Sequence, residues 1–142
     1  MSRAVFYCAP AVDTCVAEVF QATRRIDRIR DAPALVVLAL REPVNLIDLR
    51  GSFATRLGAS TAMHSGPRSR ARAWARDIYE AYPDAQGLYY GSSMNGHAPA
   101  VVLTERATSA IPEQPLFIRA LNDDLILETL QQIALRLSYG LR

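Results

Sequence analysis

The stretch "AVFYCAPAVDTCVAEVF" (residues 4–20) contains the two patterns that decide the fold. Residues 4–9 alternate large and small apolar groups and include Val, Phe and Tyr, which is typical of a β-strand. An N-cap oxygen from Asp13 or Thr14 then precedes an amphipathic run at residues 15–29. The sequence therefore predicts a strand that leads through a short turn into a helix.

The rest of the chain mixes strand-like and helix-like segments without a regular strand–helix–strand order. We expect strands at 34–40, 44–49, 87–92, 98–106 and 115–121, and helices at 68–82 and from Asn122 or Asp123 to Gly140. The continuous apolar run at 34–40 predicts a strand buried on both faces, and residues 51–67 a long surface connection. Together the segments predict a single compact α+β domain over residues 1–142, with a mixed or largely antiparallel sheet and flanking helices.

Composition excludes several functional classes. The 142 residues are 50% hydrophobic and 21% charged, which is typical of a globular protein. A net charge of +2 does not indicate direct binding of nucleic acid. The longest apolar run, 32–40, is far shorter than the ~20 residues that span a bilayer. Cys8 and Cys15 have neither metal-ligand nor disulfide-framework spacing, so we expect no metal site and a cytoplasmic location.

Glu18 is the first candidate for chemistry. In the predicted helix it lies close to the N-terminus, where a carboxylate favours the helix dipole. One interpretation is therefore a glutamate with no other role. The other is a carboxylate directed into a cleft, where it hydrogen-bonds a sugar hydroxyl or stabilises a developing positive charge.

The second candidate is the string "GLYYGSSMNG" (87–96), where a strand ends in two hydroxyls and two turns. Ser92 is either an ordinary turn residue or a donor to phosphate or ribose. A G-x-S-x-G elbow is lacking, and no base is placed to complete a triad. Ser92 is therefore interpreted as a ligand-binding residue rather than a nucleophile.

The order of these motifs resembles the RES-domain family. In "VFYCAPAVDTCVAEVFQ" (5–21) the matching positions are Tyr7, Ala9, Thr14, Ala17 and Glu18. The string "VNLIDL" (44–49) is similar to a family strand that ends in a Leu-Asp-Leu-type segment. The block at 69–96 is similar to a helix with Trp-Ala followed by Gly-Leu-x-Tyr-x-Ser, here Gly87, Leu88, Tyr90 and Ser92. The resemblance covers most of residues 4–106.

The resemblance implies specific roles. The family is named for an arginine, a glutamate and a serine; Glu18 takes the glutamate position and Ser92 the serine position, both as catalytic residues, with Ser93 as a second choice. Tyr7 takes a tyrosine position that lines the same pocket, and Tyr90 is a further substrate-binding residue. The family arginine lies well upstream of the tyrosine, so the chain is expected to be short at its N-terminus. Arg3 is the first substitute for that arginine, and Arg24 and Arg50 are others.

The implied fold is similar to that of ADP-ribosyltransferases. The implied activity is that of a toxin from bacterial toxin–antitoxin pairs that consumes NAD+ as a substrate, with no further cofactor. Such an enzyme cleaves the nicotinamide–ribose bond by hydrolysis or phosphorolysis, or transfers ADP-ribose to a protein. The implied partner is an antitoxin of the helix-turn-helix (Xre) type, and an open strand edge at the N-terminus would favour a homo-oligomer.

Two alternatives remain at this point. The chain would also fit a catalytically impaired RES protein that binds NAD+ or the antitoxin without turnover. It would equally fit an unrelated α+β interaction domain whose similarity to the family is accidental.

Overall fold

The computed structural model describes residues 4–51 and 76–142. The strands are β1 (Val5–Cys8), β2 (Arg25–Ile26), β3 (Ala34–Val37), β4 (Leu46–Asp48), β5 (Gly87–Gly91), β6 (Pro99–Thr104), β7 (Phe117–Ala120) and β8 (Gly140–Leu141). The helices are α1 (Val12–Val19), the 3₁₀ segments η1 (Glu105–Ala110) and η2 (Asp124–Ile126), and α5 (Leu127–Leu137). Residues 76–81 are also helical.

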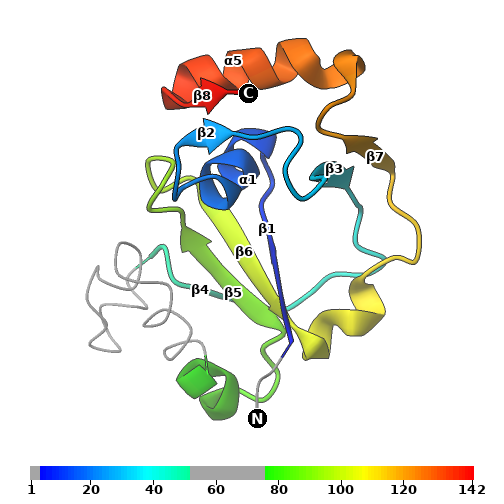
Figure 1. The fold of residues 1–142 in the computed structure, drawn as a ribbon. Helices are drawn as coiled ribbons and strands as arrows, with labels where there is room; N and C mark the ends of the chain where they lie inside the picture. Colours follow the sequence, from blue (N-terminus) through cyan, green and yellow to red (C-terminus); the bar gives the residue numbers. More distant parts are fainter. Residues whose placement is uncertain (1–3, 52–75) are drawn as a thin grey trace.

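A four-stranded sheet in the order β1-β6-β5-β4 forms the lower part of the molecule in Figure 1. Strand β6 is antiparallel to both β1 and β5, and β4 is parallel to β5. In this register Tyr7, Val102 and Leu88 lie in one row across the sheet. Because side chains alternate between the two faces of a strand, Tyr90 shares the face of these three residues.

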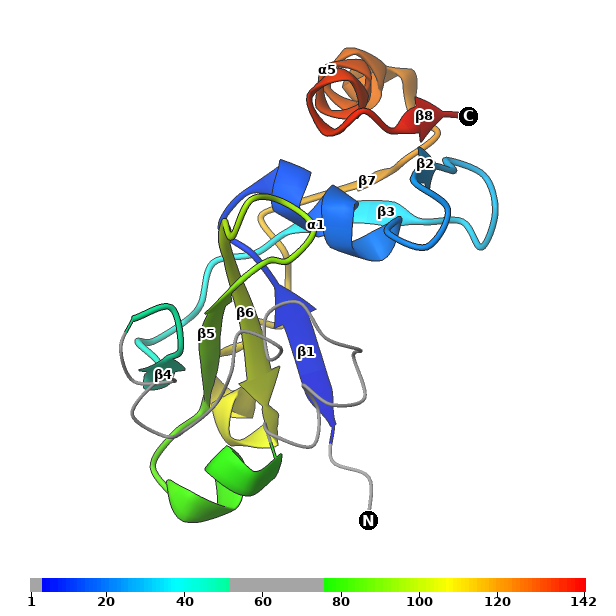
Figure 2. The same ribbon diagram turned by 90° about the vertical axis from the view of Figure 1, so that its left-hand side faces the viewer.

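Two hydrophobic clusters hold the described parts together. One lies on the sheet face just defined and joins Leu49, Ile78, Leu88 and Val102. The other lies between α1 and α5. Figure 2 shows α1 between the end of the sheet and α5. The buried members of this second cluster are Val16, Ile26, Leu121, Ile126, Leu130, Ile133 and Ala134. The predicted α+β class with a mixed sheet and flanking helices is therefore confirmed.

Helix α1 differs from the predicted helix at both ends. It starts at Val12 after the N-cap Ala11, so Asp13 and Thr14 are inside the helix and do not cap it. It ends at Val19, because the chain then turns to bring Ile26 into the core, where β2 pairs with β8. Arg24 adopts a left-handed conformation with φ 53° within this turn. Local propensity favoured a longer helix, but burial of Ile26 outweighs it.

The apolar run at 34–40 is not a strand buried on both faces. Only Ala34–Val37 forms a strand, β3, and it pairs with β7 in a separate two-stranded sheet. Val36 and Val37 are 46% and 39% exposed. The prediction was wrong because a continuous apolar run does not show whether a strand joins the central sheet.

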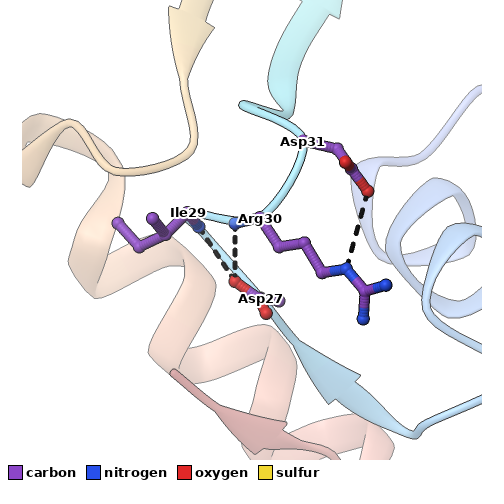
Figure 3. Close-up of polar contacts among 4 residues, drawn as sticks. All are labelled: Asp27, Ile29, Arg30 and Asp31. Atoms are coloured by element: carbon purple, nitrogen blue, oxygen red, sulfur yellow. Dashed lines mark hydrogen bonds and ion pairs between the residues drawn. The ribbon is translucent and has the colours of Figure 1, made fainter.

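Two aspartates shape turns in the upper half. Asp27 Oδ1 accepts hydrogen bonds from the backbone N–H groups of Ile29 and Arg30 at 3.0 and 2.9 Å, as Figure 3 shows, and so closes the turn after β2. Asp123 caps η2 by accepting from the N–H of Leu125 at 2.9 Å. The latter confirms one of the two capping residues expected before the C-terminal helix.

Two further predictions lie wholly or partly outside the described residues. Of the expected surface connection at 51–67, only residue 51 lies in the described part. Of the expected helix at 68–82, the structure describes residues 76–82, and residues 76–81 are helical. The C-terminal helix is confirmed, although it ends at Leu137, and Ser138 with φ 58° turns the chain there instead of Gly140. Within residues 4–51 and 76–142, no helix has both the length and the apolar character that a membrane crossing requires.

Candidate functional site

Glu18 and Ser92 meet at the end of the central sheet. Ser92 Oγ donates a hydrogen bond to Glu18 Oε1 at 2.5 Å, although 74 residues separate them in the sequence. This length is at the short end of the range for O–H···O hydrogen bonds. Figure 2 shows why they meet: α1, which carries Glu18, crosses the end of the sheet where β1 and β5 end and β6 begins. The pair joins the two predicted motifs in space.

Ser92 is fully buried and all of its polar atoms have partners. Its hydroxyl accepts from the N–H of Met94 at 3.2 Å while it donates to Glu18. Its backbone N–H donates to Ala98 O, and its carbonyl accepts from His97 N–H, at 2.8 and 2.9 Å. The hydroxyl therefore has one fixed direction, and it holds the half-buried Glu18 carboxylate in place.

A second contact fastens the same turn to α1. Asn95 Nδ2 donates to Thr14 Oγ1 at 3.1 Å, and Thr14 is fully buried. Thr14 and Glu18 are four residues apart in α1, so they lie one helical turn apart on the same face. The turn at 92–98 is thus attached at two points, Ser92 to Glu18 and Asn95 to Thr14.

The position of Glu18 in α1 corrects the interpretation of Glu18 as a dipole-stabilising residue. Glu18 is the second-last residue of the helix rather than an early one. At a helix C-terminus the macrodipole disfavours a negative charge, by typically 0.3–1 kcal/mol. Helix stability therefore gives no reason for a carboxylate here, whereas the bond from Ser92 does keep it oriented.

Tyr7, Tyr90 and Ser93 are the other predicted site residues that the structure describes. Tyr7 lies on β1, is 43% exposed and shares its sheet face with Tyr90. Ser92 lies directly after β5, two positions beyond Tyr90, and its backbone still pairs with Ala98 beside the start of β6. Ser93 is exposed at the adjacent turn position. Arg3 lies outside the described residues.

Two described arginines near the sheet, Arg106 and Arg50, already bond other groups of the protein. Arg106 donates to the carbonyls of Tyr79, Tyr82 and Ala85 at 2.9 to 3.2 Å, and it stacks on the Tyr79 ring. It thus supports the end of the helix at 76–81. Arg50 donates to the hydroxyl of Tyr89 at 3.3 Å, on the face opposite to Tyr90. Within the described residues, neither guanidinium forms a hydrogen bond or ion pair with Glu18.

Arg24, by contrast, belongs to the surroundings of Glu18. Partial burial raises the pKa of the Tyr139 hydroxyl; the positive charge of Arg24 opposes this and the negative charge of Glu18 adds to it. Both charges therefore act on one hydroxyl. Arg24 is therefore the arginine, among those named above, whose charge acts on the same hydroxyl as the charge of Glu18.

The two cysteines are protonated at neutral pH. Burial raises the pKa of Cys8 to about 11. Burial also raises the pKa of Cys15, against the effect of the Ala9 backbone N–H and with the help of the negative charges on Asp13 and Glu18. Because the thiolate is the nucleophilic form of cysteine, neither thiol is activated, even though Cys15 is close to Glu18.

Gly87 and Gly91 lie where a side chain would collide with neighbouring parts of the protein. A Cβ at Gly87 would lie 2.3 Å from the carbonyl oxygen of Val102, and one at Gly91 would lie 3.1 Å from Cβ of His97. Both glycines therefore allow close packing within the protein. Gly87 is at the start of β5, whereas Ser92 follows its end.

A shallow hollow of about 290 Å³ lies at the opposite end of β5 from Ser92. It is lined by residues 45–47 and 81–85, none of which is near Glu18 in the fold. We therefore do not assign it to the site. Among the described residues, no three His, Cys, Asp or Glu side chains gather in an arrangement that would hold a metal ion.

Sequence reasoning missed two contributors. The sequence predicted only a turn at Asn95, which in the structure bonds Thr14. The one available signal was the i,i+4 spacing of Thr14 and Glu18, which places both side chains on the same face of a helix. Tyr139 donates its hydroxyl to Ala17 O at 3.0 Å, next to Glu18. Nothing in the local sequence around Tyr139 indicates this contact, because 122 residues separate the partners.

Comparison with protein families places these observations in context. The family model described as the RES domain matches residues 1–125. Searches of curated proteins and of solved structures find no match. The family match covers both segments that meet at the site, the one around Glu18 and the one around Ser92. The chain belongs to the RES-domain family.

Proposed function

We propose that the protein is an NAD+-consuming enzyme that cleaves the bond between nicotinamide and ribose. The observation that carries the proposal is the 2.5 Å bond from buried Ser92 to Glu18, which fixes a half-buried carboxylate where two distant family motifs meet. Such a preorganised carboxylate is suited to stabilise a positive charge that develops on a substrate.

In the proposed reaction the N-glycosidic bond breaks and its electron pair leaves with neutral nicotinamide. The ribose becomes oxocarbenium-like, and the Glu18 carboxylate stabilises that charge. With water as the acceptor, the products are ADP-ribose, nicotinamide and one proton; phosphate or a protein side chain would replace water in phosphorolysis or ADP-ribosyl transfer. Glu18 is the proposed catalytic residue, and Ser92 acts through it as a positioning residue.

The substrate is proposed to lie along the sheet face that Tyr7 and Tyr90 share. Tyr7 is exposed there and offers an aromatic surface for nicotinamide or its ribose. Arg24 is proposed to bind the diphosphate, because its carbonyl bonds Gly140, the residue after the tyrosine whose hydroxyl bonds next to Glu18. Ser93 is exposed beside Ser92 and supplies a further hydroxyl. The fold is proposed to be related to that of ADP-ribosyltransferases.

An antitoxin of the helix-turn-helix type, which family membership suggests, would inhibit such an enzyme by covering Glu18 and Tyr7. Residues on this face would then lose solvent exposure in the complex. Protection of Tyr7 from hydroxyl-radical labelling upon mixing would support this arrangement.

The proposal is tested by incubating the purified chain with NAD+ and measuring free nicotinamide by chromatography. We expect nicotinamide to appear in equal amount to the NAD+ consumed, with and without added phosphate. Binding of NAD+ without release of nicotinamide would contradict the enzymatic proposal and would favour an impaired binding protein. Neither binding nor release would contradict both.

A further inference from the structure

The C-terminal segment, residues 126–142, lies beyond the region that the family model matches, yet it packs directly on the helix that carries Glu18. Leu130, Ile133 and Ala134 of α5 share a buried cluster with Val16 of α1. Figures 1 and 2 both show α5 next to α1, on the side away from the sheet. This segment therefore forms the support on which α1 rests.

One hydroxyl from this segment reaches the last turn of α1. After α5 ends, Ser138 reverses the chain and Tyr139 OH donates to Ala17 O at 3.0 Å. The carbonyls of the last turn of a helix lack intrahelical donors. The Ala17 carbonyl belongs to the peptide unit whose nitrogen is that of Glu18, so the bond fixes the peptide plane on the N-terminal side of Glu18.

The peptide plane on the other side of Glu18 is held as well. Gln21 Nε2 donates to Glu18 O at 2.9 Å. The carboxylate itself is held by Ser92. Glu18 is thus fixed at three points: one peptide plane by Tyr139, the next by Gln21, and the side chain by Ser92.

The same C-terminal stretch also anchors the connection that follows α1. Gly140 N–H donates to Arg24 O at 2.9 Å, as part of the pairing between β2 and β8. The strained residue Arg24 is therefore held from the same side as Ala17. Two consecutive residues, Tyr139 and Gly140, thus bond both the last turn of α1, which carries Glu18, and Arg24 in the connection that follows.

We propose that Tyr139 is a positioning residue for Glu18, so that the C-terminal segment outside the family match forms part of the functional site. The inference rests on the proposed function for its kinetic consequence, but its structural part stands on the Tyr139–Ala17 bond. Tyr139 is only half-buried, so water could satisfy its hydroxyl. The hydroxyl instead bonds the carbonyl adjacent to Glu18.

The test is Tyr139→Phe, which removes the hydroxyl and keeps the ring that packs on the α1–α5 cluster. The matched control is Tyr79→Phe, which removes a hydroxyl that donates to Glu105 Oε1 at 3.3 Å in a different part of the fold. A misplacement of ~1 Å costs on the order of 10²-fold in rate. For the loss of one anchor of three we expect kcat for nicotinamide release to fall about 10-fold, with KM and Tm no more altered than in the control.

Replacing Tyr139 by para-aminophenylalanine restores a donor at the same place and should recover most of the lost kcat. An unchanged kcat in Tyr139→Phe would overturn the inference and leave the proposed function intact. Loss of the folded state in Tyr139→Phe, seen by circular dichroism, would also overturn it, because the hydroxyl would then support the whole fold rather than Glu18.

A second measurement separates failure of this inference from failure of the proposed function. If the unaltered protein releases no nicotinamide, the proposed function fails, and the ¹³C resonance of the Glu18 carboxyl carbon decides the positioning role. We expect Tyr139→Phe to shift this resonance and Tyr79→Phe to leave it in place. Equal spectra for the two variants would overturn the inference without reference to any activity.

Discussion

Ser92 Oγ and Glu18 Oε1 are 2.5 Å apart, and the serine is fully buried whereas the glutamate is half-buried. The contact brings the strand–helix motif at the start of the chain to the end of β5. Because Ser92 has no exposed surface, it acts on a ligand only through Glu18. The site is therefore one carboxylate that a buried serine holds at the end of the sheet, and Tyr7 is exposed on the neighbouring strand β1.

Replacing Ser92 with Ala removes the donor that orients Glu18. Nicotinamide release from NAD+ should fall by about 10- to 100-fold, consistent with ~1.5–3 kcal/mol for a hydrogen bond to a charged group. The control is Ser109→Ala, which removes a hydroxyl that donates to a different carboxylate, Glu42 Oε1, at 2.7 Å. Equal losses in the two variants would contradict the positioning role of Ser92.

Thr14 and Asn95 should be energetically coupled. A double-mutant cycle of Thr14→Val and Asn95→Ala, measured by urea unfolding, should give a coupling energy of about 0.5–1.5 kcal/mol. The comparison cycle pairs Thr14→Val with Asn45→Ala, an exposed asparagine far along the chain, and should be additive. Additivity in both cycles would mean that the Asn95–Thr14 bond does not fasten the turn to α1.

Much of this arrangement could be predicted from the sequence, and the remainder depended on long-range contacts. The strand at 5–8 and the strand ending at Gly91 were expected from local patterns. The end of α1 at Val19 was not, because it follows from the pairing of β2 with β8 at the far end of the chain. Tyr139 was missed for the same reason. The expectation that the Glu18 carboxylate is directed into a cleft stays a prediction.

Gly87→Ala should destabilise the fold. The added Cβ would lie 2.3 Å from the Val102 carbonyl oxygen, so β5 and β6 must move apart. We expect the free energy of unfolding to fall by about 1–3 kcal/mol. Gly51→Ala is the control, since no heavy atom of the described residues beyond its chain neighbours lies within 4 Å of its added Cβ. A Gly87→Ala protein as stable as the control would show that the strands tolerate separation at this point.

Asp27 should contribute to stability in a pH-dependent manner. The backbone N–H groups of Arg30 and then Ile29 hold the pKa of this carboxyl below its ordinary value. The folded state therefore binds the proton less readily than the unfolded state, whose pKa is about 3.9. The stabilisation is present above that pH and is lost as pH falls through the folded-state pKa.

Urea unfolding of the unaltered protein and of Asp27→Asn between pH 2 and 6 (a range of about two units on either side of the unfolded pKa) checks this. The difference between the two proteins should shrink as the pH falls. Asp31→Asn is the control, because the ion pair of Asp31 with Arg30 spans 3.9 Å between exposed side chains. A difference for Asp27→Asn that is constant across this range would contradict the assignment.

The most direct test of the account compares nicotinamide release from NAD+ by the unaltered protein, by Glu18→Gln and by Glu128→Gln, an exposed glutamate in the first turn of α5. Glu18→Gln keeps the side-chain volume and an oxygen that can accept from Ser92, so circular dichroism and Tm should stay close to those of the unaltered protein. The account predicts that Glu18→Gln abolishes release while Glu128→Gln retains the full rate. Release by Glu18→Gln at the unaltered rate would contradict the central claim that this carboxylate performs the chemistry.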